Sequence, residues 1–271
     1  MPSNQHRKNI IKLMRENAHR HQLYDVFRDF VEMAALAISN SADLLNREVR
    51  EERYLAIAKR YNAEEIARFP KMLGELAMGL EVEPCDMLGQ VFHELEMSSA
   101  ERGQFFTPYH LCEAIARLTI TDDEALQEAI NRRGFITVSE PACGAGAMVI
   151  ALSQALRERG HNYQQCLHVT AIDVDSRAVH MAYLQFSLLG IPALIIEGNA
   201  LTLEERSHWH TPFPIMGMWD TKLRRGYALG SGMDDSAAPE PAFAPEPAVE
   251  PEPDLILPPP AARTEEQMAL F

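Results

Sequence analysis

Apolar residues recur at helical spacing through the first part of the chain, up to about residue 97. Strand-like alternation is scarce there, so the pattern predicts helices. The expected helices contain Ile10–Met14, Val26–Ile38, Leu44–Ile57, Ile66–Leu80 and Asp86–Met97. Ser41 or Asp43 is a suitable N-terminal cap for the third of them. The pattern therefore predicts an N-terminal bundle of about five helices.

The pattern changes after this bundle. Residues 98–108 break the helical periodicity, and proline is suited to begin the helix predicted over Pro108–Leu118. A short helix capped by Thr121 or Asp122 should follow, up to Arg132. Short apolar runs then predict buried parallel strands at Phe135–Ser139, Leu167–Ile172 and Ala193–Glu197, with a fourth strand, if present, at Phe213–Met218. Strands separated by helical segments predict an α/β fold.

The first predicted strand leads into a glycine turn. Glu140 and Pro141 end the strand, because proline has no amide hydrogen for the ladder. Gly144 and Gly146 follow, ahead of an apolar helical pattern over Met148–Leu156. This order lets a ligand approach bare backbone at a helix N-terminus. An acidic side chain at the turn argues against a phosphate and suits a ligand that carries an ammonium or sulfonium group.

Polar residues stand at the ends of the next two predicted strands. Asp173 ends the second strand, with Asp175 just beyond it as an expected helix cap, and Asn199 follows the third. In α/β nucleotide-binding folds, a carboxylate at the tip of the second strand holds ribose hydroxyls. Because the ends of parallel strands lie side by side, the three tips should form one crevice.

Four short motifs resemble those of the adenine-N6 DNA methyltransferases. They are GQFFTP at 103–108, EPACGAG at 140–146, AIDVD at 171–175 and EGNA at 197–200. The resemblance covers about residues 84–200. Within the family, the chain is most similar to modification subunits of type I restriction systems and to related plasmid or phage methylases. It implies a Rossmann-like domain that binds S-adenosyl-L-methionine and methylates DNA.

The resemblance also implies roles for individual residues at the cofactor. Glu140 would neutralise or hydrogen-bond the methionine ammonium, and Gly144 and Gly146 would allow close approach of the backbone. Asp173 would bind the ribose hydroxyls, and Asn199 would meet the amino edge of adenine. The family usually has Asp at the positions of Glu140 and Asn199, so this chain has one longer side chain and one amide that keeps an oxygen acceptor.

The loop that precedes the glycine turn is a further candidate. By resemblance, Phe106, Thr107 and Pro108 would cover the methionine end of the cofactor. The alternative is an ordinary interdomain turn in which Phe105 and Phe106 are buried.

The motif that would hold the target base is missing. Adenine-N6 transfer needs a group that accepts hydrogen bonds from the target amine. In the family this is Asn or Asp followed by two prolines and an aromatic residue, and the sequence contains no such tetrapeptide. MWDT at 218–221 stands in its place, where Trp219 would stack on the flipped base and Asp220 would accept. The alternative is that Trp219 belongs to the core and Asp220 caps a strand end.

The charge of the chain counts against tight, independent binding to duplex DNA. The net charge of the chain is -14. Residues 234–271 hold nine acids and one base, so the net charge of residues 1–233 is still -6. Basic residues cluster at Arg7, Lys8, Lys12, Arg15 and Arg20, and again at Lys222, Arg224 and Arg225. Both clusters are interpreted as solvated surface rather than as DNA contacts.

The cysteines point to a reducing compartment. Cys85, Cys112, Cys143 and Cys166 are scattered, a pattern that suits neither a metal site nor a disulfide framework. No apolar run is long enough to cross a bilayer, and no basic-then-apolar leader is present. A cytoplasmic protein without a metal is therefore expected.

The end of the chain differs in composition from the rest. After Tyr227 it is rich in Gly, Ser, Ala, Pro and Glu, which predicts an extended, disordered tail. The terminal QMALF resembles the Gln-x-x-Leu-Phe peptides that dock bacterial sliding clamps, through Gln267, Leu270 and Phe271.

Three parts are therefore expected: a helical domain at 1–97, a methyltransferase-like domain at 98–226 and the tail at 227–271. The sheet has room for about four strands, so either the sheet is minimal or a protein partner covers its open edge. The leading hypothesis is an adenine-N6 DNA methyltransferase. A catalytically inactive module that binds S-adenosylmethionine and serves a partner is the alternative, and RNA or protein methylation is a third. The role of the helical domain, in packing or in contact with DNA or a partner, stays open.

Overall fold

The structure is a computed structural model that describes residues 2–95, 107–120 and 123–233. All of these belong to one compact unit, Met1–Ala238. Residues 234–271 of the predicted tail, which include Gln267, Leu270 and Phe271, lie outside the described residues, as does Phe106.

Six helices lie within the described residues 2–95, and they agree closely with the helical pattern of the sequence. They are α1 (Pro2–Asn17), α2 (Leu23–Ala42), α3 (Arg47–Ala58), α4 (Ala63–Ile66), α5 (Arg68–Val82) and α6 (Met87–Glu94). The helix expected from Ser41 or Asp43 begins later, at Arg47, and Leu44 and Leu45 stay exposed in the connecting loop. Asp43 instead accepts a hydrogen bond from the backbone N–H of Asn46, which holds the loop.

The α/β part follows these helices. Its helices are α7 (Tyr109–Thr119), α8 (Asp123–Arg133), α9 (Ala147–Glu158), α10 (Tyr163–Cys166), α11 (Ser176–Leu189), α12 (Pro212–Met216) and α13 (Trp219–Arg225). Its strands are β1 (Ile136–Glu140), β2 (Leu167–Asp173), β3 (Ala193–Asn199) and β4 (Glu204–His210).

The four strands form one sheet in the order β1-β2-β3-β4. The first three run parallel, and β4 pairs antiparallel with β3, with an irregularity between Glu197 and Gly198. Within the described residues β1 pairs only with β2, so its outer edge carries unpaired backbone groups. Cover of that edge by a partner stays a prediction.

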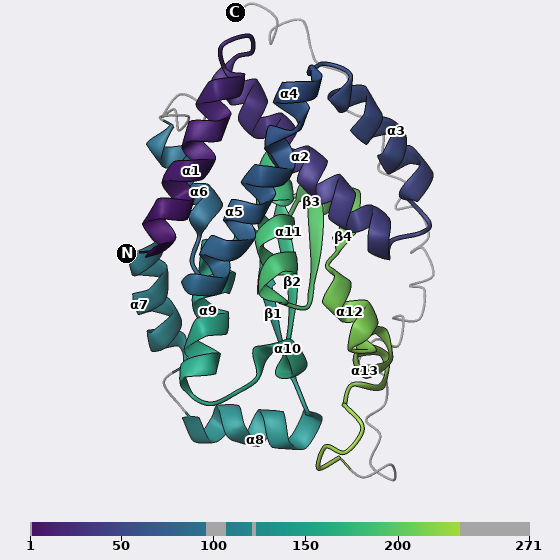
Figure 1. Cartoon of the computed structure of the whole chain (residues 1–271). Helices are drawn as coiled ribbons and strands as arrows, with labels where there is room; N and C mark the ends of the chain where they lie inside the picture. The colour runs from purple at the N-terminus through teal and green to yellow at the C-terminus, as the bar shows by residue number, and fades with distance from the viewer. Residues whose placement is uncertain (1, 96–106, 121–122, 234–271) are drawn as a thin grey trace, which may run out of the picture. The chain divides into compact units, whose positions relative to one another are not determined.

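The core lies on the face of the sheet that α11 crosses (Figure 1). Alternate residues of β2 and β3 point into it and are fully buried, namely Leu167, Val169, Ala171, Ala193 and Ile195. Helix α11 packs between the sheet and α2, so the N-terminal helices share this core with the sheet. On the other face, Thr137 and Ser139 of β1 are exposed. One face of the sheet is thus well covered and the other only in part.

The fourth strand is not where the hydrophobic pattern predicted it. Residues 213–218, expected to be a strand, form α12 and its exit, and β4 comes earlier. The sequence of β4, EERSHWH, shows little apolar alternation, because this edge strand buries only Trp209. None of the described helices is long and apolar enough to cross a membrane.

Candidate active site

The carboxyl ends of the three parallel strands lie side by side, as expected. In the sheet register Glu140 stands opposite Ala171, and Asp173 stands opposite Glu197, two residues before the end of β3 at Asn199. The structure therefore brings the sequence-predicted residues of three separate motifs to one edge. This edge is the usual position of a ligand in open α/β sheets.

The glycine turn needs both of its predicted glycines. Gly144 and Gly146 have φ angles of 53° and 93°, in the left-handed region that other residues rarely adopt. A Cβ atom at Gly146 would also collide with the ring of Phe186 on α11. The turn is fastened to β2 by the Cys143 N–H, which donates to the Ile172 carbonyl at 2.9 Å. Bare backbone is thus held in a fixed position beside the tip of β2.

Asp173 connects this turn to its own strand. Its Oδ2 accepts from the Gly144 N–H at 2.8 Å, and its Oδ1 accepts from the Asp175 N–H at 2.9 Å. Since an ionised carboxylate has about four lone-pair sites, each oxygen keeps one for a ligand hydroxyl. Burial raises the pKa of the Asp173 carboxyl, and the backbone N–H groups of Asp175, Gly144 and Val174 oppose that effect.

Glu140 is the last residue of β1, at the start of the glycine turn. Its Oε1 accepts from the Ala142 N–H at 3.2 Å. Burial raises the pKa of the Cys143 and Cys112 thiols, and the Glu140 charge adds to the rise at both. The carboxylate therefore acts on two elements, and a ligand cation at this position would be stabilised by it.

Asn199 has a more restricted role than its oxygen alone suggests. Its Oδ1 already accepts from the Leu201 N–H at 2.9 Å and from the Thr202 N–H at 3.4 Å, which closes the turn after β3. The side chain can still offer its Nδ2 amide hydrogens. Contact with adenine stays a prediction, and these hydrogen bonds favour donation by Asn199 over acceptance.

A cavity of about 650 Å³ lies beside the start of α7. Thr107 and Pro108 are exposed on its rim, with Asp86, Tyr109 and Glu113 among the other lining residues. This volume is within the range of small-molecule sites. Two of the three loop residues predicted to cover the cofactor thus line a cavity.

Residues 85–216 match the sequence model of the family described as N-6 DNA Methylase. This segment is similar to the N-6 DNA methylases. Among solved structures, the chain is similar to a protein of Listeria monocytogenes assigned to the class I S-adenosylmethionine-dependent methyltransferases, with 15% identity and a TM-score of 0.40. That match covers 80% of this chain and 70% of the other. No curated protein matches the sequence.

Sequence reasoning missed a buried polar network within residues 85–216. Gln185 of α11 donates through Nε2 to the Ala145 carbonyl at 2.8 Å and to Asp86 Oδ1 at 2.9 Å, and its Oε1 accepts from the Leu88 N–H. The network joins the glycine turn, α11 and the start of α6, and Asp86 also lines the cavity. The available signal was a glutamine within the apolar run of α11, where a buried polar side chain calls for a partner.

The prediction for Trp219 and Asp220 was wrong in position. Trp219 is fully buried, with its ring 5.4 Å from that of Phe135 and 5.3 Å from that of His168. Those two residues stand at the amino ends of β1 and β2, about 16 Å from the tip at Glu140 at 3.3 Å per residue. Figure 1 shows α8 and α13 at this amino end. The ring therefore completes the core and is not free to stack on a base.

Asp220 is exposed on α13 and pairs with Arg224 at 3.1 Å. It belongs to the first turn of a helix and not to a strand end. Asp220 is therefore neither an acceptor beside the strand tips nor the cap of a strand end, because its segment is helical and lies at the amino ends of the strands.

The residues at the strand tips fit S-adenosylmethionine. The cofactor carries two ribose hydroxyls and two cationic centres, the ammonium and the sulfonium. Asp173 has free lone pairs for hydroxyls, Glu140 supplies negative charge, and Gly144 and Gly146 leave bare backbone in the turn beside them. The charge of the site and the bare backbone of the turn agree with the methyltransferase family.

Proposed function

We propose that this protein binds S-adenosylmethionine at the carboxyl edge of β1–β3 and uses it to methylate N6 of adenine in DNA. The observation that carries the proposal is the 2.8 Å hydrogen bond from the Gly144 N–H to Asp173. It fixes bare backbone next to a carboxylate with free lone pairs, an arrangement suited to a nucleoside with a charged amino-acid tail. The match to the N-6 DNA methylase family supports DNA adenine as the substrate.

The residues of the site have separate tasks in this proposal. When bound, the cofactor supplies an electrophilic methyl group. Asp173 holds the ribose, Glu140 offsets the cationic charge, and Asn199 orients the adenine ring by donating from Nδ2. Thr107 and Pro108, on the rim of the cavity, exclude water from the methionine end. Fixing both reactants in this way removes much of the entropic cost of a bimolecular transfer.

A second candidate is a cofactor-binding subunit that does not catalyse transfer. The observation in its favour is the position of Trp219, which leaves the described part of the chain without the predicted stacking ring at the site. The sequence also lacks the Asn/Asp-Pro-Pro-aromatic tetrapeptide. In this alternative, the acceptor for the target amine comes from another protein.

Methyl transfer from labelled cofactor to unmethylated DNA decides between the two. Methylation by the purified wild-type protein is the expected result. The Asp220→Ala variant should also methylate DNA, because Asp220 lies at the amino ends of the strands and the site at their carboxyl ends. Cofactor binding by calorimetry without transfer, even after addition of cell extract, would establish the non-catalytic subunit. Absence of cofactor binding would remove both candidates. Loss of transfer in Asp220→Ala alone would return the acceptor role to that residue.

A further inference from the structure

One face of α1 carries a row of cations. Lys8, Lys12 and Arg15 are exposed, and at 100° per residue they lie within about 60° of arc around the helix. Within the described residues no ion pair involves these three side chains, whereas the neighbouring Arg7 and Arg20 pair with glutamates at 3.1 and 3.3 Å. We call Lys8, Lys12 and Arg15 the α1 stripe. Its charges are available to a ligand.

The charge of this segment is opposite to that of the chain. Residues 2–20 contain five bases and one acid, Glu16, which gives +4 with histidines neutral. The whole chain is at -14. A local positive surface on an acidic protein attracts polyanions to that surface and repels them elsewhere.

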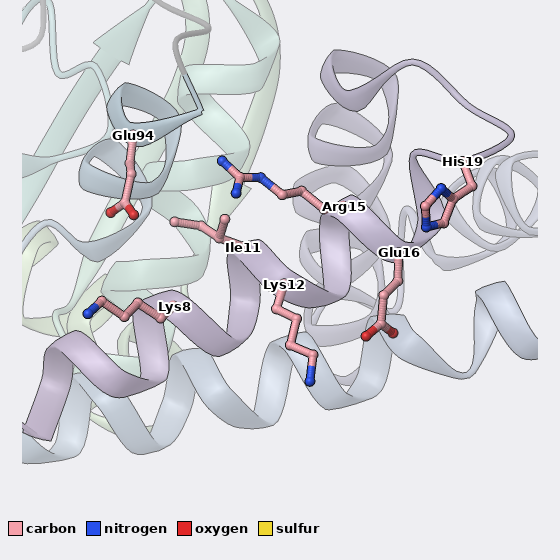
Figure 2. Close-up of a pocket in the computed structure, with 7 residues that line it drawn as sticks. All are labelled: Lys8, Ile11, Lys12, Arg15, Glu16, His19 and Glu94. Carbon is pink, nitrogen blue, oxygen red and sulfur yellow. The ribbon is translucent and has the colours of Figure 1, made fainter.

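The α1 stripe borders a groove between α1 and the end of α6. The groove has a volume of about 410 Å³, and Figure 2 shows Lys8, Arg15 and Glu94 around it, with Ile11 between them. Glu94 also lines the 650 Å³ cavity described above. The groove beside the stripe therefore adjoins the cavity, which Asp86 of the buried polar network also lines.

We propose that the α1 stripe holds the sugar–phosphate backbone of duplex DNA, an inference that rests on the proposed function. From Lys8 to Arg15 the helix rises about 10 Å, at 1.5 Å per residue. One DNA strand presents a phosphate every 3.4 Å along the axis, so the stripe spans about three phosphates. Its contacts are made to the backbone and position the duplex without reading its sequence.

The charge of the cavity next to the α1 stripe indicates which part of the DNA each of them binds. Asp86, Glu94 and Glu113 line the cavity together with one cation, Arg7, which pairs with Glu94 at 3.1 Å. The remaining negative charge disfavours a phosphate there. A flipped base is uncharged and meets no such repulsion. The backbone is therefore held on the stripe while a base enters the cavity.

The test is the salt dependence of DNA binding, measured by fluorescence anisotropy with a labelled duplex between 50 and 200 mM salt. The variant Lys8→Gln/Lys12→Gln/Arg15→Gln keeps good helix formers on α1. Because each neutralised phosphate contributes about 0.9 to the slope of log K against log salt, the slope should flatten by about 2.7. Over this fourfold range of salt, wild type should lose about 40-fold more affinity than the variant.

Lys59→Gln/Arg157→Gln/Arg225→Gln is the matched control, because it removes the same charge from exposed positions on α9, α13 and the end of α3. It should keep the wild-type slope. An unchanged slope in the stripe variant, equal flattening in the control, or binding of RNA but not of duplex DNA would each overturn the proposal. Calorimetry with S-adenosylmethionine should be unaffected in the stripe variant, so failure of the cofactor site is seen separately from failure of the stripe.

Discussion

Asp173→Asn tests the proposed cofactor site most directly. In the free protein the two carboxylate oxygens accept from Gly144 and Asp175 at 2.8 and 2.9 Å. The amide has only one oxygen, so its Nδ2 must face one of these N–H donors. The substitution also removes the charge and one of the two positions available to the ribose hydroxyls.

The expected magnitude follows from these contacts. One hydrogen bond to a charged group contributes about 1.5–3 kcal/mol. At 1.4 kcal/mol for each factor of ten, its loss weakens cofactor binding about 10- to 150-fold. Because the ionised carboxylate accepts from the hydroxyls, wild-type affinity should also fall as the pH falls through the raised pKa of Asp173, and the variant should lose that pH dependence.

The assay is calorimetric titration with S-adenosylmethionine across a range of pH, with thermal denaturation in parallel. Glu197→Gln is the control. Glu197 stands opposite Asp173 in the sheet, and glutamine keeps an oxygen for the Ser207 hydroxyl, which donates to Glu197 at 2.9 Å. Wild-type affinity in Asp173→Asn, or an equal loss in Glu197→Gln, would refute the specific role of Asp173.

Two further predictions concern the stability of the fold. Gly146→Ala should destabilise the fold by about 2–5 kcal/mol, because it strains the backbone and makes a methyl group collide with α11. Gly160→Ala, at a φ of 82° with free space around it, should lower the free energy of unfolding by only about 1–2 kcal/mol. Equal losses of stability in thermal melts of the two variants would contradict the close packing at Gly146. Burial lowers the pKa of His168 and His180 to about 4, so their contribution to stability, about 3 kcal/mol each, is present above pH 6.5 and lost as the pH falls toward 4. Urea melts from pH 7 to 4.5 should show this loss, and an equally steep loss in His168→Gln/His180→Gln would count against the assignment.

Local pattern was sufficient for the elements that bury a regular face. Helices α1, α2, α5 and α6 and strands β2 and β3 follow from apolar periodicity, since each places a row of apolar residues in the core. Helix α3 buries only Arg50 and Ile57. The strand tips could also be placed from sequence. Parallel strands joined by helices must end at one edge, and Asp173 and Asn199 end theirs.

Elements with a weak apolar pattern could not be placed in this way. Strand β4 is polar and lies at an edge, while residues 213–218 are apolar yet form a helix and its exit. The position of Trp219 after the strands in the sequence predicts that it stacks on a base. Only the fold shows that this position is at the amino end, against Phe135 and His168.

By itself the sequence determined the α/β class, the glycine turn and the acidic residues at the strand tips, because these depend on local periodicity and on backbone conformations that glycine alone adopts readily. The tertiary structure decided which residues meet across long distances in the chain. Asp86 and Gln185 are 99 residues apart and share one hydrogen-bond network. Such contacts depend on how helices pack, and a single helix gives no sign of which neighbour will cover its polar side chain.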